Sequence, residues 1–148
     1  MKGAANAMKL VRFLYNGREQ YGDLQADTIR LLGGALDTGF TPSDKCAARA
    51  DVRLLAPVRP SKAVCIGLNY MDHIIESHEK VPTSPVVFIK PSTAVIGPGD
   101  RIVYPAQSKR VDYEGELAIV IGRRAKNVPE HEAASHILGY TCANDVTA

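Results

Sequence analysis

The spacing of apolar and polar residues predicts that the chain begins with short strands. Apolar residues recur at strand spacing over residues 10–14, 20–24 and 28–32. The first two segments flank Asn16-Gly17, a dipeptide typical of a two-residue hairpin turn. Residues 33–51 are less regular, with a short helix expected over 44–50. The pattern therefore predicts a small β-rich module at the N-terminus, with no chemical motif of its own.

Pro57 and Pro60 bracket a predicted linker, and strands together with a few helices are expected after it. Helices are expected over residues 71–78 and 129–136. Strands are expected over residues 63–66, 86–89, 93–96, 101–104 and 117–121, with a tight turn at 97–100. Because helices are few, the order predicts an α+β fold with a mainly β core. We expect an N-terminal module over residues 1–57 and part of a catalytic domain over 58–148.

Composition narrows the classes of partner and compartment. The 148 residues carry 18 basic and 16 acidic side chains, a net charge of +2 without a basic stripe, so no nucleic-acid partner is expected. No apolar run approaches the ~20 residues that span a bilayer, so no membrane partner is expected either. Residues 1–7 are too short and too weakly apolar for a signal peptide. They are interpreted as an extension, or as the product of an upstream start codon, ahead of a natural start at Met8. The odd number of cysteines, 3, suits reduced thiols in a cytoplasm.

The continuous apolar run over residues 117–121 predicts a strand covered on both faces. Two carboxylates precede this run. Glu114 and Glu116 are two residues apart, so they project from the same face of the strand. Like charges beside a core require a cation, a proton or a basic partner, and Mg²⁺ is the simplest compensation. The alternative is an edge strand with both glutamates solvated, the commoner situation for two such residues alone.

Two further segments carry residues suited to catalysis or metal binding. His73 and Glu76 are at i and i+3 of a predicted helix, where a carboxylate beside an imidazole suits a general base. The alternative is a surface His–Glu pair. Asp145 lies at the end of an apolar strand, where it would complete a three-carboxylate metal site with the two glutamates. Its alternative is an ordinary Asn-Asp turn.

Five segments taken together resemble the fumarylacetoacetate hydrolase family, of the acylpyruvase or 2-hydroxyhepta-2,4-diene-1,7-dioate isomerase type. They are Gly-Leu-Asn-Tyr-Met-Asp-His-Ile-Ile-Glu at 67–76, Pro-Val-Val-Phe-Ile-Lys-Pro at 85–91, Gly-Pro-Gly-Asp at 97–100, Asp-Tyr-Glu-Gly-Glu-Leu-Ala-Ile-Val-Ile-Gly at 112–122 and Gly-Tyr-Thr-Cys-Ala-Asn-Asp-Val-Thr-Ala at 139–148. The resemblance runs from about residue 52 to the last residue. It implies a mixed-sheet β-roll, incomplete here, that follows the small N-terminal module.

The resemblance also implies a Mg²⁺- or Mn²⁺-dependent enzyme that acts on small 2-oxo or 1,3-dioxo acids, as in the catabolism of aromatic compounds. Family members cleave C–C bonds, decarboxylate, hydrate or tautomerise, and a homodimer is expected for the complete protein. By resemblance, the metal ligands are Glu114, Glu116 and Asp145, the catalytic residues are His73 and Glu76, and Lys90 binds substrate. For Lys90, capping of a strand end at the surface is an equally open alternative.

The sequence departs from the family pattern at its end. The family continues beyond the Asn-Asp-Val-Thr-Ala segment with further catalytic-domain residues, including a Lys-Ser segment near the substrate, whereas this sequence stops at Ala148. We therefore expect a chain truncated within the catalytic domain, as a natural fragment, a split gene product or a shortened version. The expected activity is that of a metal-dependent hydrolase or isomerase. The alternatives are a 2-oxo-alkenoate hydratase or decarboxylase, and an inactive fragment that needs a complementing chain.

Overall fold

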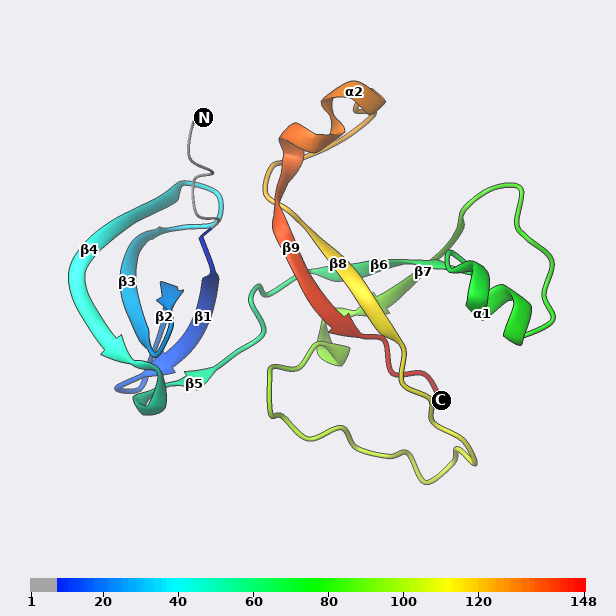
Figure 1. Ribbon diagram of the computed structural model, residues 1–148, viewed down its shortest axis with the longest axis horizontal. Coiled ribbons are helices and arrows are strands. Elements are labelled where there is room, and N and C mark those ends of the chain that lie inside the picture. Colours follow the sequence, from blue (N-terminus) through cyan, green and yellow to red (C-terminus); the bar gives the residue numbers. More distant parts are fainter. Residues whose placement is uncertain (1–7) are drawn as a thin grey trace. The chain divides into compact units, whose positions relative to one another are not determined.

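The computed structural model describes residues 8–148, so the predicted extension over residues 1–7 lies outside the described residues. Two compact units are present and are treated separately. The first contains the residues up to 31 together with 44–100, and the second contains residues 32–43 and 101–148. Strands predominate and the helices are short, which confirms the predicted α+β class with a mainly β core (Figure 1).

The N-terminal residues form a five-stranded sheet in the order β4-β3-β2-β1-β5. Its strands are β1 (Leu10–Tyr15), β2 (Arg18–Gln25), β3 (Thr28–Ala35), β4 (Gly39–Ala48) and β5 (Arg53–Leu54). The β1–β2 hairpin turns at Asn16 and Gly17, with φ of 49° and 73°, as the predicted two-residue turn requires. The short helix predicted over residues 44–50 is wrong. Pairing with β3 holds the segment in β4, and only the 3₁₀ turn η1 (Arg49–Asp51) follows it.

The buried core of this sheet consists of Phe13, Ile29, Ala47 and Val52. The first two side chains are fully buried. Gly22 on β2 lies so close to Ile29 that a Cβ atom there would overlap its side chain. The alternation of apolar residues along β1 to β3 thus builds a core without any catalytic residue.

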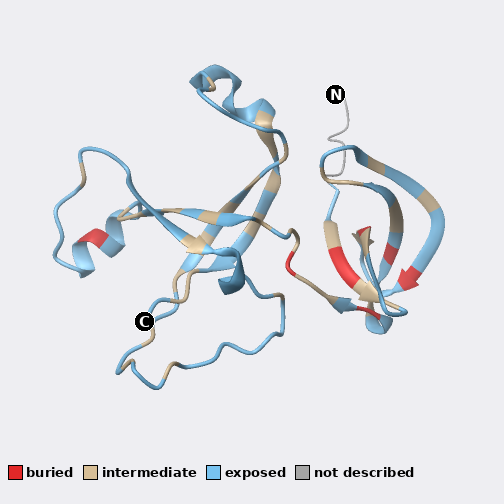
Figure 2. Cartoon of the chain, turned by 180° about the vertical axis from the view of Figure 1, so that it is seen from behind, coloured by how far each residue is buried: buried red, intermediate tan, exposed pale blue. Residues whose placement is uncertain are grey.

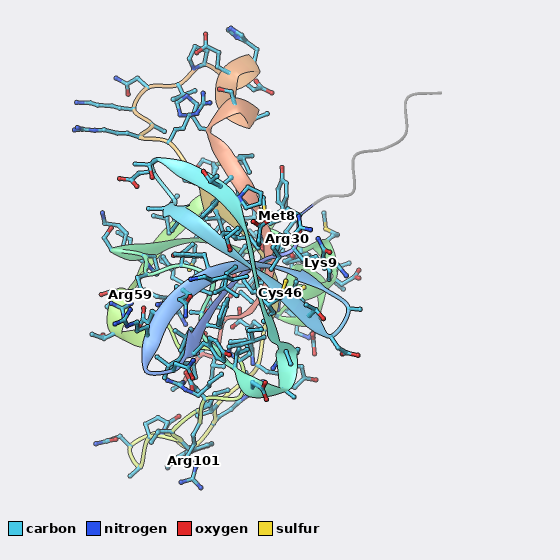
Figure 3. The ribbon with its side chains drawn as sticks, turned by 90° about the vertical axis from the view of Figure 1, so that its left-hand side faces the viewer. Met8, Lys9, Arg30, Cys46, Arg59 and Arg101 are labelled. Carbon is cyan, nitrogen blue, oxygen red and sulfur yellow. The ribbon has the colours of Figure 1, made fainter. Side chains whose placement is uncertain are left out.

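The segment predicted to be a linker is held against the sheet at two points. Arg12 of β1 is buried, and its Nε donates to the carbonyl oxygen of Ala56 at 2.8 Å. Its Nη1 also pairs with Oε2 of Glu19 at 2.7 Å. The other carboxylate oxygen of Glu19 pairs with Arg59, which is labelled in Figure 3. The two arginines and one glutamate therefore connect β1 and β2 to both ends of the 56–59 segment.

The predicted tight turn at 97–100 is confirmed, and it packs closely against the backbone of Leu55 and Ala56, at the start of the same segment. The amide of Asp100 donates to the carbonyl of Gly97 at 3.1 Å, and the amide of Gly97 donates to Oδ2 of Asp100 at 2.8 Å. A Cβ atom on Gly97 would lie 2.8 Å from the amide nitrogen of Ala56, so a glycine is required for this contact. The strands predicted on either side are wrong, because residues 92–94 form the 3₁₀ turn η2 (Ser92–Ala94) and residues 101–104 are irregular.

Loss of the Arg12 side chain should weaken the attachment of the 56–59 segment to the sheet. Arg12→Ala removes a buried charged donor and leaves the Ala56 carbonyl without it, at a cost of about 2 kcal/mol. We expect amide exchange of Leu55, which donates to the Arg12 carbonyl, to accelerate roughly 30-fold. Arg53→Ala is the control, because its pair with Asp100 spans 3.4 Å between exposed side chains. Equal exchange at Leu55 in both variants would contradict the role of Arg12.

The remaining strands form two antiparallel ribbons of two strands each. In the first unit, β6 (Lys62–Gly67) pairs with β7 (Val86–Pro91), and α1 (Met71–Glu76) lies between them in sequence. In the second unit, β8 (Gly115–Ile121) pairs with β9 (Ile137–Asn144). Two short helical segments connect β8 to β9, namely α2 (Glu130–Ala133) and the 3₁₀ turn η3 (Ala134–His136). The predicted helices around 71–78 and 129–136 are thus confirmed.

Burial along β8 differs from the sequence prediction of a strand covered on both faces. Exposed and half-buried residues alternate along β8, and Figure 2 shows no buried residue on β8 or β9. Within residues 8–148, β9 is the only strand that pairs with β8, and no strand or helix covers its apolar side chains. Cys142 on β9 is exposed for the same reason, while Cys65 on β6 is half-buried.

Candidate functional site

The register of β8 and β9 brings the three predicted metal-binding carboxylates to neighbouring positions. Gly115 faces Asn144 and Glu116 faces Ala143. The same register continues beyond the strands, because the amide of Asp145 donates to the carbonyl of Glu114 at 2.8 Å and Asp112 bridges Thr147. Glu114 therefore lies opposite Asp145, and Glu116 follows two residues along the same strand. All three occupy one face of the ribbon.

A residue that the sequence analysis did not select holds the end of this ribbon together. The side-chain oxygen of Asn144 accepts a hydrogen bond from the amide of Glu114 at 3.0 Å. Asn144 thus fixes the backbone of one carboxylate residue and immediately precedes another, Asp145. Its place in the Asn-Asp pair was the available signal, but a turn was an equally good explanation of that pair.

The three carboxylates are half-buried, and their chemistry suits a hard divalent cation such as Mg²⁺ or Mn²⁺. Within residues 8–148, no group of three or more His, Cys, Asp or Glu side chains is gathered closely enough to hold an ion. The backbone register thus places the ligand positions together, whereas the side chains do not converge on one point. The prediction of a metal site therefore rests on the carboxylate chemistry of these three residues and on the register of β8 and β9.

Helix α1 carries the predicted His–Glu pair. Ile74 is the buried residue of the helix, and both His73 and Glu76 are exposed. The helix ends at Ser77, whose amide and hydroxyl both donate to the carbonyl of His73, at 3.0 and 2.6 Å. Across the described residues, no ion pair joins the His73 imidazole to the Glu76 carboxylate. The pair shares a helix and solvent access, as a group that exchanges protons with a small molecule must.

Lys90 lies on β7, opposite Ala63 of β6, and is half-buried. It is the last residue but one of its strand. This position is compatible with both interpretations made from the sequence, a substrate-binding ammonium group and a strand-end lysine, so its role stays a prediction.

Comparison with known families covers nearly the whole described chain. Residues 62–148 match the family described as "Fumarylacetoacetate (FAA) hydrolase C-terminal". The chain belongs to the fumarylacetoacetate hydrolase family. Residues 8–57 match a second family, "Rv2993c-like, N-terminal", so the small β-sheet that precedes the hydrolase part is also shared with other proteins.

Individual relatives of this chain support its assignment to the fumarylacetoacetate hydrolase family. An uncharacterized protein of Archaeoglobus fulgidus is 49% identical over 139 residues, which are 94% of this chain and 52% of that protein. The human protein named oxaloacetate tautomerase FAHD2A, mitochondrial, is 46% identical over 101 residues, covering 68% of this chain and 32% of that protein. The crystal structure of 2-hydroxyhepta-2,4-diene-1,7-dioate isomerase from Mycobacterium marinum is 38% identical with a TM-score of 0.84, covering 96% of this chain and 55% of that one.

The chain spans about half the length, or less, of the relatives that it matches. Its fold and family are thus those of hydrolases and isomerases of this type, while the sequence covers one part of such proteins. No helix in residues 8–148 is long and apolar enough to cross a membrane.

Proposed function

We propose that this chain supplies the metal ligands and the proton-transfer residues of an enzyme that acts on small 2-oxo or 1,3-dioxo carboxylic acids. The single observation that carries the proposal is the register of Glu114, Glu116 and Asp145 on one face of the β8–β9 ribbon. Three carboxylates at adjacent positions repel one another unless a cation or protons compensate them. In a chain of this family, a divalent cation is the compensation that also serves chemistry.

The names of the relatives narrow the reaction. Oxaloacetate is a 2-oxo dicarboxylic acid, and its tautomerisation moves a proton between carbon 3 and the oxygen on carbon 2. The isomerase name describes a 2-hydroxy-diene dicarboxylate whose double bonds change position. Both reactions move a proton next to the enol or keto group of a small dicarboxylate. We therefore favour tautomerisation or isomerisation of a 2-oxo acid over hydration or decarboxylation.

Each candidate residue then has a distinct part. Glu114, Glu116 and Asp145 would hold Mg²⁺ or Mn²⁺, which supplies positive charge to stabilise an oxyanion of the substrate. The exposed imidazole of His73 would accept the proton and return it, and Glu76 on the same helix would orient that imidazole. Lys90 would bind a substrate carboxylate as a point charge.

Assays of three substrates side by side test the proposed reaction class. The protein for this test is a chimera, in which this chain is joined to the part of the Archaeoglobus fulgidus relative that follows the matched residues. We expect metal-dependent turnover of oxaloacetate tautomers or of a 2-hydroxydienoate to exceed hydrolysis of an acylpyruvate. Faster hydrolysis of the acylpyruvate would instead assign the chain to C–C bond cleavage.

The 148-residue chain alone should behave differently from the chimera. Because two-stranded ribbons are marginally stable and exposed strand edges pair with other chains, we expect the short chain to self-associate or aggregate and to show no turnover. The chimera should be soluble and, by family resemblance, a homodimer. Size-exclusion chromatography and the same assays decide this. A monodisperse, active short chain would contradict the expectation.

A further inference from the structure

The face of the β8–β9 ribbon that carries the carboxylates continues beyond the start of β8. The amide of Asp112 donates to the carbonyl of Thr147 at 2.9 Å, and the amide of Thr147 donates to the carbonyl of Asp112 at 3.1 Å. This pair keeps the register in which Glu114 lies opposite Asp145, so Asp112 projects from the same face as Glu114. Asp112 is therefore a further acid in the row of Glu114 and Glu116, at a backbone separation of roughly 7 Å from Glu114.

This further carboxylate has a basic partner of its own. Nε of Arg110 lies 3.0 Å from Oδ1 and 2.8 Å from Oδ2 of Asp112. The backbone of Arg110 is held as well, because its amide donates to the hydroxyl of Ser108 at 3.2 Å and its carbonyl accepts from that hydroxyl. Contacts at both the backbone and the side chain thus orient the guanidinium of Arg110 at the end of the row.

Exposure to solvent increases along this row. Glu114 and Glu116 are half-buried, whereas the side chains of Asp112 and Arg110 are 51% and 82% exposed. An ion pair between such exposed side chains contributes little to stability. The position of Arg110 is better suited to recognition, because it places a cation within reach of an anion that binds along the row of acids.

We propose that Arg110, oriented by Asp112, binds the distal carboxylate of a 2-oxo dicarboxylic acid whose 2-oxo end lies at the three predicted metal-binding carboxylates. The inference rests on the proposed function, and it narrows the substrate class to dicarboxylates rather than 2-oxo monocarboxylic acids. The separation of roughly 7 Å between Asp112 and Glu114 is one that a small dicarboxylate can span. A guanidinium presents its donors in a planar fork that matches a carboxylate, and contact of Asp112 with Nε fixes the plane of that fork.

Binding of two acids of equal length tests the proposal. 2-Oxoglutarate carries a distal carboxylate, and 2-oxopentanoate has a methyl group in its place. Calorimetry measures both affinities for the chimera described above at saturating Mn²⁺, so that differences in metal affinity do not enter the comparison. We expect the parent to bind 2-oxoglutarate at least ~10-fold more tightly than 2-oxopentanoate, since the charged end gains a charge-assisted hydrogen bond.

Arg110→Gln should remove this preference. The variant is expected to bind 2-oxoglutarate at least ~10-fold more weakly than the parent and to bind 2-oxopentanoate within twofold of it, because only the distal carboxylate loses its partner. Arg123→Gln is the matched control. Arg123 is an exposed arginine that follows the opposite end of β8, outside the row, so both affinities should stay within twofold of the parent.

The part played by Asp112 is tested by the sign of a second change. Asp112→Asn keeps the size of the side chain and removes its charge. If the carboxylate orients Arg110, the variant should bind 2-oxoglutarate more weakly and leave 2-oxopentanoate unchanged. Tighter binding of 2-oxoglutarate would overturn the orienting role, since Asp112 would then only compete for the guanidinium.

The outcomes separate this inference from the proposed function. Equal affinity of the parent for both acids, or an equal loss of both in Arg110→Gln, would overturn the inference and leave the proposed function in place. If the Mn²⁺-loaded parent binds neither acid, the proposed function fails and the inference fails with it.

Discussion

Replacing His73 by alanine in the chimera is expected to lower kcat by ~10²–10⁴, with metal affinity unchanged, because the reaction then lacks its general base. The expectation follows from the position of His73 on the same short, solvent-accessible helix as Glu76, in a chain of the fumarylacetoacetate hydrolase family. Steady-state kinetics on the preferred substrate measures the loss, and calorimetry with Mn²⁺ verifies that the metal still binds.

The control for this variant is His131→Ala. His131 is an exposed histidine on α2, beside Glu132 in sequence, and 3.5 Å separate its Nε2 from the Glu132 carboxylate. It therefore reproduces the general features of a surface histidine close to an acid, without the predicted role, and should keep kcat within a few-fold of the parent. If His73→Ala behaves like His131→Ala, His73 is not the base, and another residue moves the proton.

Replacing Glu116 by alanine is expected to weaken Mn²⁺ binding by more than ~10²-fold. Loss of residues that only support metal ligands already costs about 10–100-fold in affinity or activity, and a direct ligand should cost more. Glu116 suits this test because it lies within β8, opposite Ala143, so its truncation leaves the backbone ladder in place. Calorimetry with Mn²⁺ on the chimera and on the variant gives the two affinities.

Glu130→Ala provides the matched control, since Glu130 is an exposed glutamate at the start of α2. It removes the same charge from the second unit without touching the β8–β9 ribbon. Equal Mn²⁺ affinity in the parent and both variants would mean that the three carboxylates are not the metal site.

Local chemistry explains which parts of the fold were predictable from sequence. Asn16-Gly17 specified a hairpin because both residues accept positive φ. The Gly97-Pro98-Gly99-Asp100 turn was equally readable, since its hydrogen bonds are formed within four residues. Residues 44–48 were misread as helical because their alanines favour a helix locally, whereas pairing within the sheet, a long-range interaction, determines their structure.

The candidate site was predictable in part for a similar reason. The i and i+2 spacing placed Glu114 and Glu116 on one face, but the position of Asp145 opposite Glu114 depends on register, which the sequence alone left open. The support from Asn144 was missed because a side chain that binds a distant backbone amide leaves no periodic signal. The exposure of Leu117 and Ile119 was missed because a continuous apolar run indicates burial whether or not the covering layer is present.

Turnover after removal of metal tests the central claim, that Glu114, Glu116 and Asp145 form the cation site of a 2-oxo acid enzyme. The chimera is treated with chelator, assayed on its preferred substrate, and then titrated with Mn²⁺, with the rate in the absence of protein subtracted at each concentration. The account predicts that turnover falls to background and is restored by Mn²⁺ in the parent but not in Glu116→Ala. Full turnover in the chelated parent, or equal restoration in Glu116→Ala, would contradict it.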